Sequence, residues 1–400
     1  MMTKSEKIVL FLLAFIQFVH IVDFMIMMPL GPQLMRIFDI QPRQFSWLVS
    51  SYTFSAGTMS IASAFFIDKF DRKRSFVVFL IGFTIGTLAC AFAKDYTQLL
   101  MARIVTGFFG GILSSMVLSI VSDLVPPQER GTAMGIVSIS FSLASIFGVP
   151  FSIFLATRYN WHSPFLFLGI VSAVFVGLVL RFIPPMNKHL LLQKPESSFK
   201  HVMKLFTEPH PRRAMLFVLC LMTGQFAIIP FLSPFLVANT GIAESQLPIF
   251  YFVGGICSII VSPWVGRMAD RLGKQKVATY ALLVSIPIML FITSLGEVGI
   301  GVVVLAFALF FTASGARMVT SMAIVTTTVT TERRGAFMSL ISSIQQFSAA
   351  LGSMLAGIVV VRSADGHLNN YFLTGCMAAV MTLVSVSLMR RIKPAEVATF

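Results

Sequence analysis

The stretch GRMADRLGKQK at residues 266–276 decides the fold, because a looser copy, AFFIDKFDRKR, stands 202 residues earlier at residues 64–74. A second pair of landmarks agrees with the first. Glu129-Arg130-Gly131 returns as Arg333-Arg334-Gly335 at an offset of 204 residues. Both offsets are close to half the chain length of 400, and such self-similarity indicates an internal duplication. We therefore predict a chain built from two similar halves.

Between these landmarks the chain consists of long apolar runs. Hydrophobic residues make up 56% and charged residues 12% of the sequence, with a mean hydropathy of +0.87, which is typical of integral membrane proteins. An apolar run of about 20 residues crosses a bilayer as a helix. Six runs qualify in each half, near residues 8–28, 46–67, 75–93, 98–121, 133–155, 164–183, 214–238, 248–266, 277–295, 299–325, 336–361 and 370–389. We predict twelve membrane-spanning helices.

A polar stretch from Pro184 to Arg213 separates the sixth run from the seventh. It predicts an N-terminal six-helix bundle over residues 1–186, a cytoplasmic linker over 187–213 and a C-terminal six-helix bundle over 214–400. Within the linker, residues 197–206 place apolar side chains on one face and lysines on the other, which is typical of a short helix lying in the membrane interface.

The positive charges indicate the orientation. When the twelve runs are threaded alternately through a membrane, one side receives 23 of the 30 Lys and Arg residues and the other side 5. Positive residues collect in cytoplasmic loops, so we expect both termini in the cytoplasm and the chain in a bacterial inner membrane. This distribution over short loops also explains the net charge of +14 without a nucleic acid partner, which would need a basic soluble face.

The loop motif is similar to that of the major facilitator superfamily. The pattern G-x-x-x-D-R-x-G-[RK]-x-[RK] is complete in the second half, whereas the first half has Ala64 and Asp71 where that family has glycines. The resemblance covers essentially the whole chain and implies an all-α membrane protein with twelve helices in two pseudo-symmetric six-helix bundles, working as a secondary transporter. The gating residues that it implies are Asp68, Arg72, Gly266, Asp270, Arg271 and Gly273.

An acid at a helix end can accept hydrogen bonds from a facing helix N-terminus, and adjacent cations can meet lipid phosphate or helix C-termini. The loops are therefore interpreted as latches between helices. Asp71 adds a second acid, which we expect to pair with Arg72 or Arg74. The alternative is that Arg72, Lys73 and Arg74 only fix the orientation of the chain.

Ionisable residues inside apolar runs are costly and usually functional. Arg103 opens the sequence RIVTGFFGG, which resembles the arginine and glycine motif of the superfamily's fourth helix, and Asp23 is the one carboxylate well inside the first run. Burial favours a protonated carboxyl, whereas a nearby arginine favours the carboxylate. We predict a proton-coupling site formed by Asp23, Arg103 and His20 as a possible relay. A permanently ionised structural pair is the alternative.

Further polar residues inside the helices are candidates for a substrate cavity. Arg317 lies deep in the tenth run, where it is expected to face an acid or an anionic group of the substrate, unless helix carbonyls satisfy it. The full candidate set is Gln17, Gln225, Arg317, Gln345 and Gln346.

The fifth run contains Gly148 and Pro150, which resemble an antiporter motif of drug and sugar exporters, although Phe151 and Ser152 stand where further glycine is expected. Small residues also simply allow close helix packing.

Together these features predict a proton-coupled secondary active transporter that exports a small lipophilic or sugar-like solute by alternating access. An importer of a small metabolite is the alternative within this class. A non-transporting receptor or an intramembrane enzyme is the alternative from other classes. The sequence has no phosphate-binding loop and no nucleophile motif, so we expect neither an ATP-driven pump nor an enzyme.

No cofactor is expected, and no metal site, because His20 and Asp23 lack a third ligand. The expected partners are the solute, protons and the lipid bilayer, and we expect a monomer.

Overall fold

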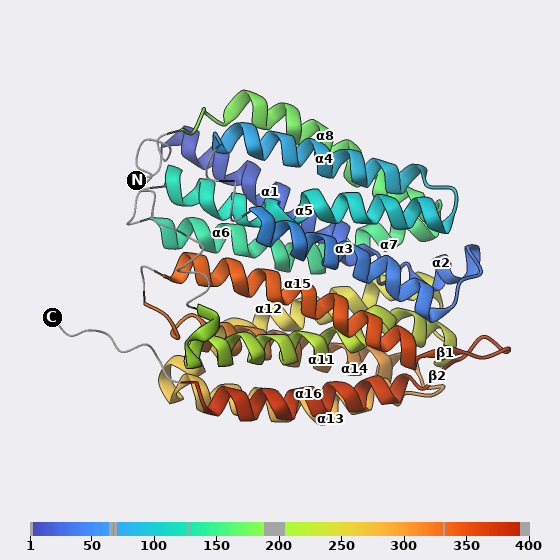
Figure 1. Ribbon diagram of the computed structural model, residues 1–400. Helices are drawn as coiled ribbons and strands as arrows, with labels where there is room; N and C mark the ends of the chain where they lie inside the picture. The colour runs from blue at the N-terminus through green and yellow to red at the C-terminus, as the bar shows by residue number, and fades with distance from the viewer. Residues whose placement is uncertain are drawn as a thin grey trace. The chain divides into compact units, whose positions relative to one another are not determined.

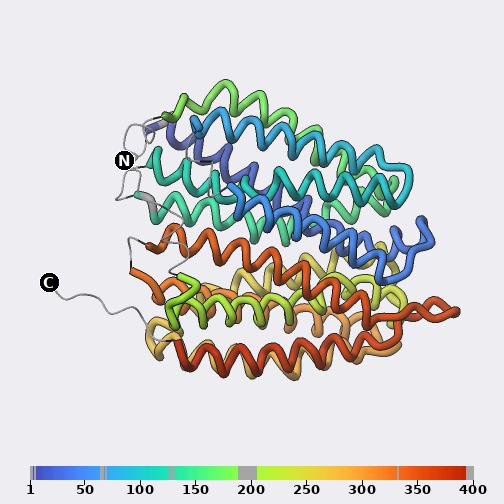
Figure 2. The backbone as a smooth tube through the Cα atoms, in the orientation of Figure 1, coloured from blue at the N-terminus to red at the C-terminus, as the bar shows by residue number. Residues whose placement is uncertain are grey.

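The computed structural model describes residues 3–63, 67, 70–125, 129–187, 205–330 and 333–392, without the side chains of Lys4, Ser5 and Arg130. Its elements are almost all long helices, arranged side by side within each half (Figures 1 and 2). The elements are α1 (Lys4–Ile26), α2 (Gly31–Ile37), α3 (Pro42–Ser63), α4 (Arg72–Phe92), α5 (Tyr96–Leu124), α6 (Arg130–Leu143), η2 (Ala144–Gly148), α7 (Val149–Arg158), α8 (His162–Phe182), α11 (Pro209–Asn239), η3 (Glu244–Gln246), α12 (Leu247–Leu272), α13 (Lys274–Thr293), α14 (Ile300–Val325), α15 (Arg334–Val359), β1 (Val361–Arg362), β2 (Leu368–Asn369) and α16 (Tyr371–Arg390).

Ten helices in this described part are long and apolar enough to cross a membrane, with α6, η2 and α7 counted as one. Two further helices, α3 with 22 residues and α15 with 26, have a similar length but carry more serine and glutamine among their apolar residues. These twelve helices coincide with the twelve runs of the sequence. Polar side chains inside a membrane helix are placed against protein rather than lipid, which accounts for the lower hydropathy of α3 and α15.

The structure adds elements that the sequence did not predict. The first helix ends at Ile26, and a short turn leads into α2. The second residue of α2 is Pro32, and proline is tolerated in the first turn of a helix because the amide hydrogen there has no helical partner. A small hairpin pairs β1 with β2 in antiparallel register, Val361 opposite Asn369. Its turn contains Gly366 with φ of 90°, a conformation that favours glycine.

The chain divides into two compact units. Unit 1 comprises residues 1–30 and 51–196, and unit 2 comprises residues 31–50 and 197–400. The predicted bundles 1–186 and 214–400 and the linker 187–213 stay a prediction, and residues 188–204 of that linker, with most of the predicted interfacial helix, lie outside the described residues. Residues 31–50 belong to unit 2, since Phe45 packs edge-on against Phe231 and Ser353 Oγ donates to the Ser46 carbonyl at 3.3 Å.

Within unit 2, α2 is tied to η3 by an ion pair. Arg36 Nη1 lies 2.6 Å from Glu244 Oε1. The hydrogen bond to Glu244 raises the pKa of Arg36. Because the Arg36 side chain is 62% exposed, this pair adds little to stability and mainly orients the two short helices.

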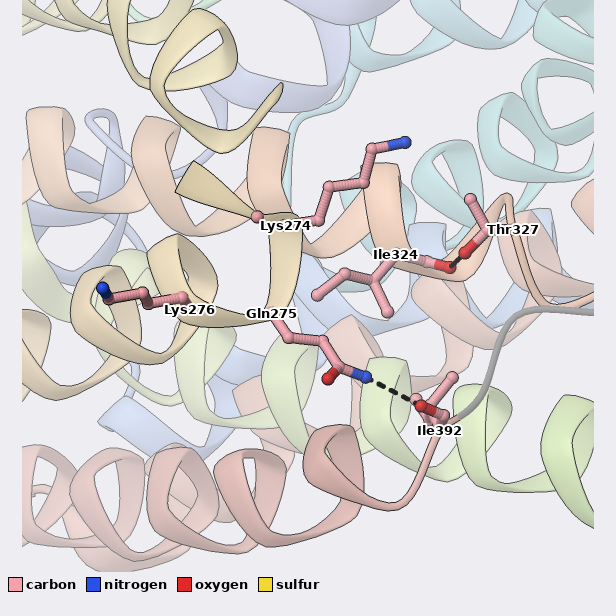
Figure 3. Close-up of a pocket in the computed structure, with 7 residues that line it drawn as sticks. Lys274, Gln275, Lys276, Ile324, Thr327 and Ile392 are labelled. Carbon is pink, nitrogen blue, oxygen red and sulfur yellow. Dashed lines mark hydrogen bonds between the residues drawn. The ribbon is translucent and has the colours of Figure 1, made fainter. Parts of the chain in front are cut away.

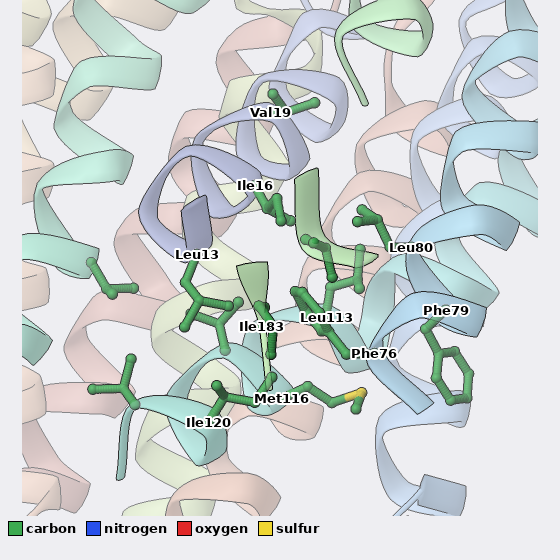
Figure 4. Close-up of a cluster of buried hydrophobic side chains, with 14 of the residues drawn as sticks. Leu13, Ile16, Val19, Phe76, Phe79, Leu80, Leu113, Met116, Ile120 and Ile183 are labelled. Atoms are coloured by element: carbon green, nitrogen blue, oxygen red, sulfur yellow. The ribbon is translucent and has the colours of Figure 1, made fainter. Parts of the chain in front are cut away.

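Unit 1 is held together by apolar packing between α1, α4 and α5. Leu13 and Ile16 of α1 lie near Leu113 and Met116 of α5, with Phe76 of α4 beside them (Figure 4). Lipid tails are as apolar as these side chains, so helix association in a membrane depends on close van der Waals packing. Unit 2 has a corresponding core of Phe217, Leu221, Leu282, Ile324, Phe337 and Met389.

Two glycines of α5 set how closely that helix approaches α3. A Cβ added at Gly107 would lie 2.3 Å from the Tyr52 carbonyl oxygen, and one added at Gly111 would lie 2.3 Å from the Ala56 carbonyl oxygen. Both positions therefore require the absence of a side chain. The close approach also brings Tyr52 of α3 next to the buried polar residues of unit 1.

The Gly111→Ala variant is expected to lower the melting temperature of the detergent-solubilised protein, because the added methyl group must push two backbones apart at a cost of about 1–3 kcal/mol. The matched control is Gly177→Ala on α8, where nothing lies within 4 Å of the added Cβ. Thermal unfolding followed by size-exclusion chromatography measures both. Equal melting temperatures for the two variants would contradict the packing argument.

Candidate functional site

The candidate site of unit 1 is a buried ion pair between α1 and α5. Arg103 Nη1 donates to Asp23 Oδ2 at 3.0 Å and to the Asp23 carbonyl oxygen at 3.2 Å. Both side chains are fully buried. Thr87 of α4 donates to the other carboxylate oxygen at 3.2 Å. The structure thus brings together Asp23 and Arg103, which sequence reasoning had paired.

Burying either charge alone would be expensive, since moving an ion out of water costs several kcal/mol even after the protein relaxes. The pair offsets this cost by attraction and hydrogen bonding. Among the described residues, Arg103 Nε and Nη2 have no hydrogen-bond partner. The guanidinium instead lies over the Tyr52 ring, with its Cζ 4.3 Å from the ring centroid, an arrangement in which the aromatic face attracts the cation.

His20 is connected to this pair through Tyr52. His20 Nε2 lies 3.0 Å from the Tyr52 hydroxyl, and both side chains are buried. His20 Nδ1 has no partner among the described residues. A Cβ at Gly110 would lie 2.8 Å from the Tyr52 hydroxyl. The absence of a side chain at this position therefore provides the space in which His20 and Tyr52 meet. Asp23, Arg103, Tyr52 and His20 form one continuous buried chain of polar groups.

Sequence reasoning did not find Tyr52 and Thr87. Hydroxyl residues are frequent in membrane helices, so neither stood out. The available signal was weak: Tyr52 lies in the polar helix α3, and a buried tyrosine normally has a hydrogen-bond partner.

Gln17 lies one turn before His20 on α1. Its Nε2 donates to Ser114 Oγ of α5 at 2.9 Å, and its Oε1 has no partner in the described part of the chain. Gln17 therefore extends the polar face of α1 beyond the ion pair.

The antiporter-like Gly148 is the last residue of a π-helical turn, η2, between α6 and α7, and Pro150 is the second residue of α7. Pro150 has no amide hydrogen to donate to the carbonyl four residues earlier, and the wider turn accommodates that missing bond. A Cβ on Gly148 would lie 2.2 Å from Val22 Cγ2. The π turn, a feature frequent at functional sites, therefore packs against the residue next to Asp23.

Unit 2 also contains a buried charge, Arg317 of α14. Its Nη1 lies 3.4 Å from Gln225 Oε1 and 3.3 Å from Met289 Sδ, and its Nη2 lies 3.4 Å from Thr382 Oγ1. The residue is 2% exposed and forms no ion pair with any described acid. The structure thus brings Gln225 and Arg317 together. Gln345 instead lies near Met322 Sδ, and Gln346 is half-buried.

The first-half loop differs from the expected latch. Asp71 does not pair with the side chain of Arg72 or Arg74. It accepts from the Arg74 amide at 2.8 Å as the N-cap of α4, and from the Met186 amide at 2.8 Å, because a carboxylate before a helix satisfies free N–H groups. Arg72 forms an ion pair with Asp123 at 2.9 Å. Asp68 lies outside the described residues.

The second-half loop carries the complete motif. Gly273, with φ of 96°, joins α12 to α13, while Gly266, Asp270 and Arg271 occupy the last two turns of α12, where Asp270 and Arg271 are exposed. Beyond Gly273 the loop lines a cavity of about 430 Å³ with Ile324, Thr327 and Ile392. There Gln275 Nε2 donates to the Ile392 carbonyl at 2.8 Å, and Lys274 and Lys276 extend in different directions (Figure 3). This loop is therefore tied to the end of α16.

The described residues contain no group of three His, Cys, Asp or Glu side chains that could hold a metal ion.

A model of the Major Facilitator Superfamily matches residues 13–353 and 214–399. The chain belongs to this superfamily of membrane transporters, which are not enzymes, and the predicted fold of twelve helices is confirmed. It is a multi-pass membrane protein.

Among its relatives is the uncharacterised transporter YceJ of Bacillus subtilis, 24% identical over 67% of this chain and 68% of that protein. A probable sugar efflux transporter of Helicobacter pylori is 22% identical over 64% of each chain. A bacterial homologue of the human lysosomal transporter Spinster, solved in an inward-facing, unoccupied conformation, has a TM-score of 0.80 at 16% identity over 99% of this chain and all of that one.

Because Asp23 and Arg103 stabilise each other, removing one partner is expected to lower the stability of the protein more than removing both. Arg103→Met should lower stability by about 3–5 kcal/mol by leaving a buried carboxylate unpaired. The Asp23→Asn, Arg103→Met double variant should recover part of that loss. Melting temperatures of the purified proteins give the comparison, and additive losses in the double variant would show that the ion pair is not coupled.

Proposed function

We propose that this transporter couples the movement of protons to the export of a small lipophilic or sugar-like solute, and that Asp23 carries the proton. The observation that carries the proposal is the fully buried Asp23–Arg103 pair at 3.0 Å. Ionisable groups inside a membrane protein are functional sites by default. Asp23 is held by one arginine and one threonine, so its charge depends on contacts that a conformational change can alter.

The coupling follows from two opposed influences on Asp23. The low dielectric around the carboxyl favours its protonated form, whereas the Arg103 charge favours the carboxylate. Alternating access wets and dries the site in turn. When water reaches the pair, the carboxylate loses little by ionising and can release its proton; when the site is dry and Arg103 shifts, protonation is favoured. Each cycle then carries one proton per Asp23.

His20 and Tyr52 supply a path for the proton. The Tyr52 hydroxyl can donate to or accept from His20 Nε2 at 3.0 Å, and the same ring contacts the Arg103 guanidinium. A proton can move between His20 and Tyr52 because each both donates and accepts hydrogen bonds, whereas Arg103 only donates, so the step between Tyr52 and Asp23 passes through water that enters the site. His20 therefore acts as the relay in this proposal.

Export is supported by the similarity to the Helicobacter pylori protein, a probable sugar efflux transporter. The π turn beside Val22 ends at the antiporter-like Gly148, and Pro150 follows as the second residue of α7. We take this arrangement as consistent with exchange of solute against protons. The proposed location is a bacterial inner membrane, with both termini in the cytoplasm on the strength of the loop charges.

The Asp23→Asn variant is expected to abolish solute-driven proton movement, because asparagine keeps the shape of the side chain but cannot take up a proton. Proteoliposomes with an entrapped pH dye measure this movement. The matched control is Asp39→Asn, an exposed acid at a position with φ of 47° that asparagine tolerates. Wild-type proton movement in Asp23→Asn would sink the proposal.

The orientation is tested by cysteine labelling in intact cells. A cysteine at Tyr159, which is 70% exposed between α7 and α8, should react with a membrane-impermeant thiol reagent from outside. A cysteine at the exposed Lys276 should react only after the membrane is permeabilised. The reverse pattern would place the termini on the other side.

A further inference from the structure

Unit 2 repeats two positions of the unit 1 charge site with different side chains, whereas its arginine stands 214 residues after Arg103 and comes from a different position. Gln225 stands 202 residues after Asp23, and Met289 stands 202 residues after Thr87. This is the offset of the duplicated loop motif. The carboxylate of the first half is thus an amide in the second, and the hydroxyl is a thioether. A buried guanidinium, Arg317, nevertheless reaches both of these side chains.

The Arg317 charge is poorly matched by its neighbours. A guanidinium is always charged in proteins, and its good hydrogen bonds to charged partners span about 2.7–2.9 Å. The two contacts of Arg317 with oxygen are to neutral groups at 3.4 Å, and the third is to the sulfur of Met289, which is only a weak acceptor. No acid among the described residues pairs with it, in contrast to Arg103.

One edge of this guanidinium is especially open. Nε has no partner among the described residues, and Nη2 has only the long contact to Thr382. Nε and Nη2 form a planar pair of donors that matches the two oxygens of a carboxylate or phosphate. Ser321, one turn further along α14, is also fully buried with an unpaired hydroxyl in the described part of the chain, and residues four apart share a helix face.

Gln225 lies against one side of the Arg317 guanidinium. The Gln225 amide donates from Nε2 to Ser314 Oγ at 2.9 Å and accepts from Arg317 through Oε1. Gln225 and Ser314 are half-buried, whereas Arg317 is buried. Rotation of this amide would remove one of the three contacts of the guanidinium without moving a helix.

We propose that Arg317 is the binding site for an oxyanion group of the transported solute, a carboxylate or a phosphate, with Gln225 as the side chain that yields to it. This inference rests on the proposed function and adds the chemical class of the solute. The solute would combine a small apolar or sugar-like body with one oxyanion, whose oxygens bind the Nε and Nη2 edge and the Ser321 hydroxyl.

The test compares benzoate and phenyl phosphate with neutral benzamide as probes. The purified protein in detergent is titrated with each probe, and its melting temperature is followed. We expect a saturable rise with at least one oxyanion and none with benzamide, since ligand binding to the folded state raises stability. The better of the two oxyanions identifies the solute as a carboxylate or a phosphate. No response to either oxyanion would overturn the proposal.

Two variants assign the response to Arg317. Gln225→Glu places a carboxylate beside the guanidinium, so it should raise the basal melting temperature and weaken oxyanion binding at least about tenfold, as expected for losing a charge-assisted contact. Arg317→Gln should lose the response; because that variant can be unstable, the stabilised Gln225→Glu keeps the test decisive. The matched control is Gln44→Glu, an exposed change of the same charge in the same unit, which should respond like the wild type. A wild-type response in Gln225→Glu would refute the site.

The test of oxyanion binding at Arg317 is independent of the test of proton coupling at Asp23, because binding in detergent involves no proton gradient. Oxyanion binding without solute-driven proton movement would leave the Arg317 site intact and remove the coupling role of Asp23. Proton coupling with wild-type oxyanion binding in Gln225→Glu would remove the Arg317 site alone.

Discussion

A charge inside a membrane protein must be satisfied within the protein, and the Asp23–Arg103 pair shows how much structure that constraint organises. The carboxylate needs Arg103 and Thr87, so α1, α4 and α5 must meet at one point. The guanidinium needs the Tyr52 face, which adds α3. Gly107 makes this meeting possible by letting α5 approach α3 closely, and Gly110 leaves space for the Tyr52 hydroxyl and the His20 ring.

The two halves show what duplication preserves. The helices and the motif loops are kept in both halves. In each half the motif loop is also hydrogen-bonded to the residues that follow the last helix: Asp71 accepts from the Met186 amide after α8, and Gln275 donates to the Ile392 carbonyl after α16. The chemistry at the centre of each unit has diverged. One half matches its arginine with an acid, and the other leaves its arginine among neutral groups. We propose that the site of the first half binds protons and that the site of the second half binds the solute.

The sequence predicted the helices and the nearness of Asp23 to Arg103 for one physical reason. Apolar runs and isolated charges carry large free energies in a bilayer, so they are visible without a structure. Features that contribute smaller free energies were not predicted. Tyr52 and Thr87 carry no net charge, α2 and the β1–β2 hairpin are too short for a periodic pattern, and Asp71 turned out to cap a helix instead of pairing with a neighbouring arginine. For Arg317, the sequence left open an acid or a substrate anion, and the described residues provide no acid.

The π turn at η2 changes how the fifth transmembrane segment should be read. An extra residue in one turn rotates everything after it by roughly 100° relative to an unbroken α-helix. A helical wheel drawn through residues 130–158 therefore places Ser152 on the wrong side relative to Ser138 and Ser140. Alignments of this segment between relatives have the same difficulty, because one inserted or deleted residue at the π turn exchanges which side chains face α1 while leaving the hydropathy profile unchanged.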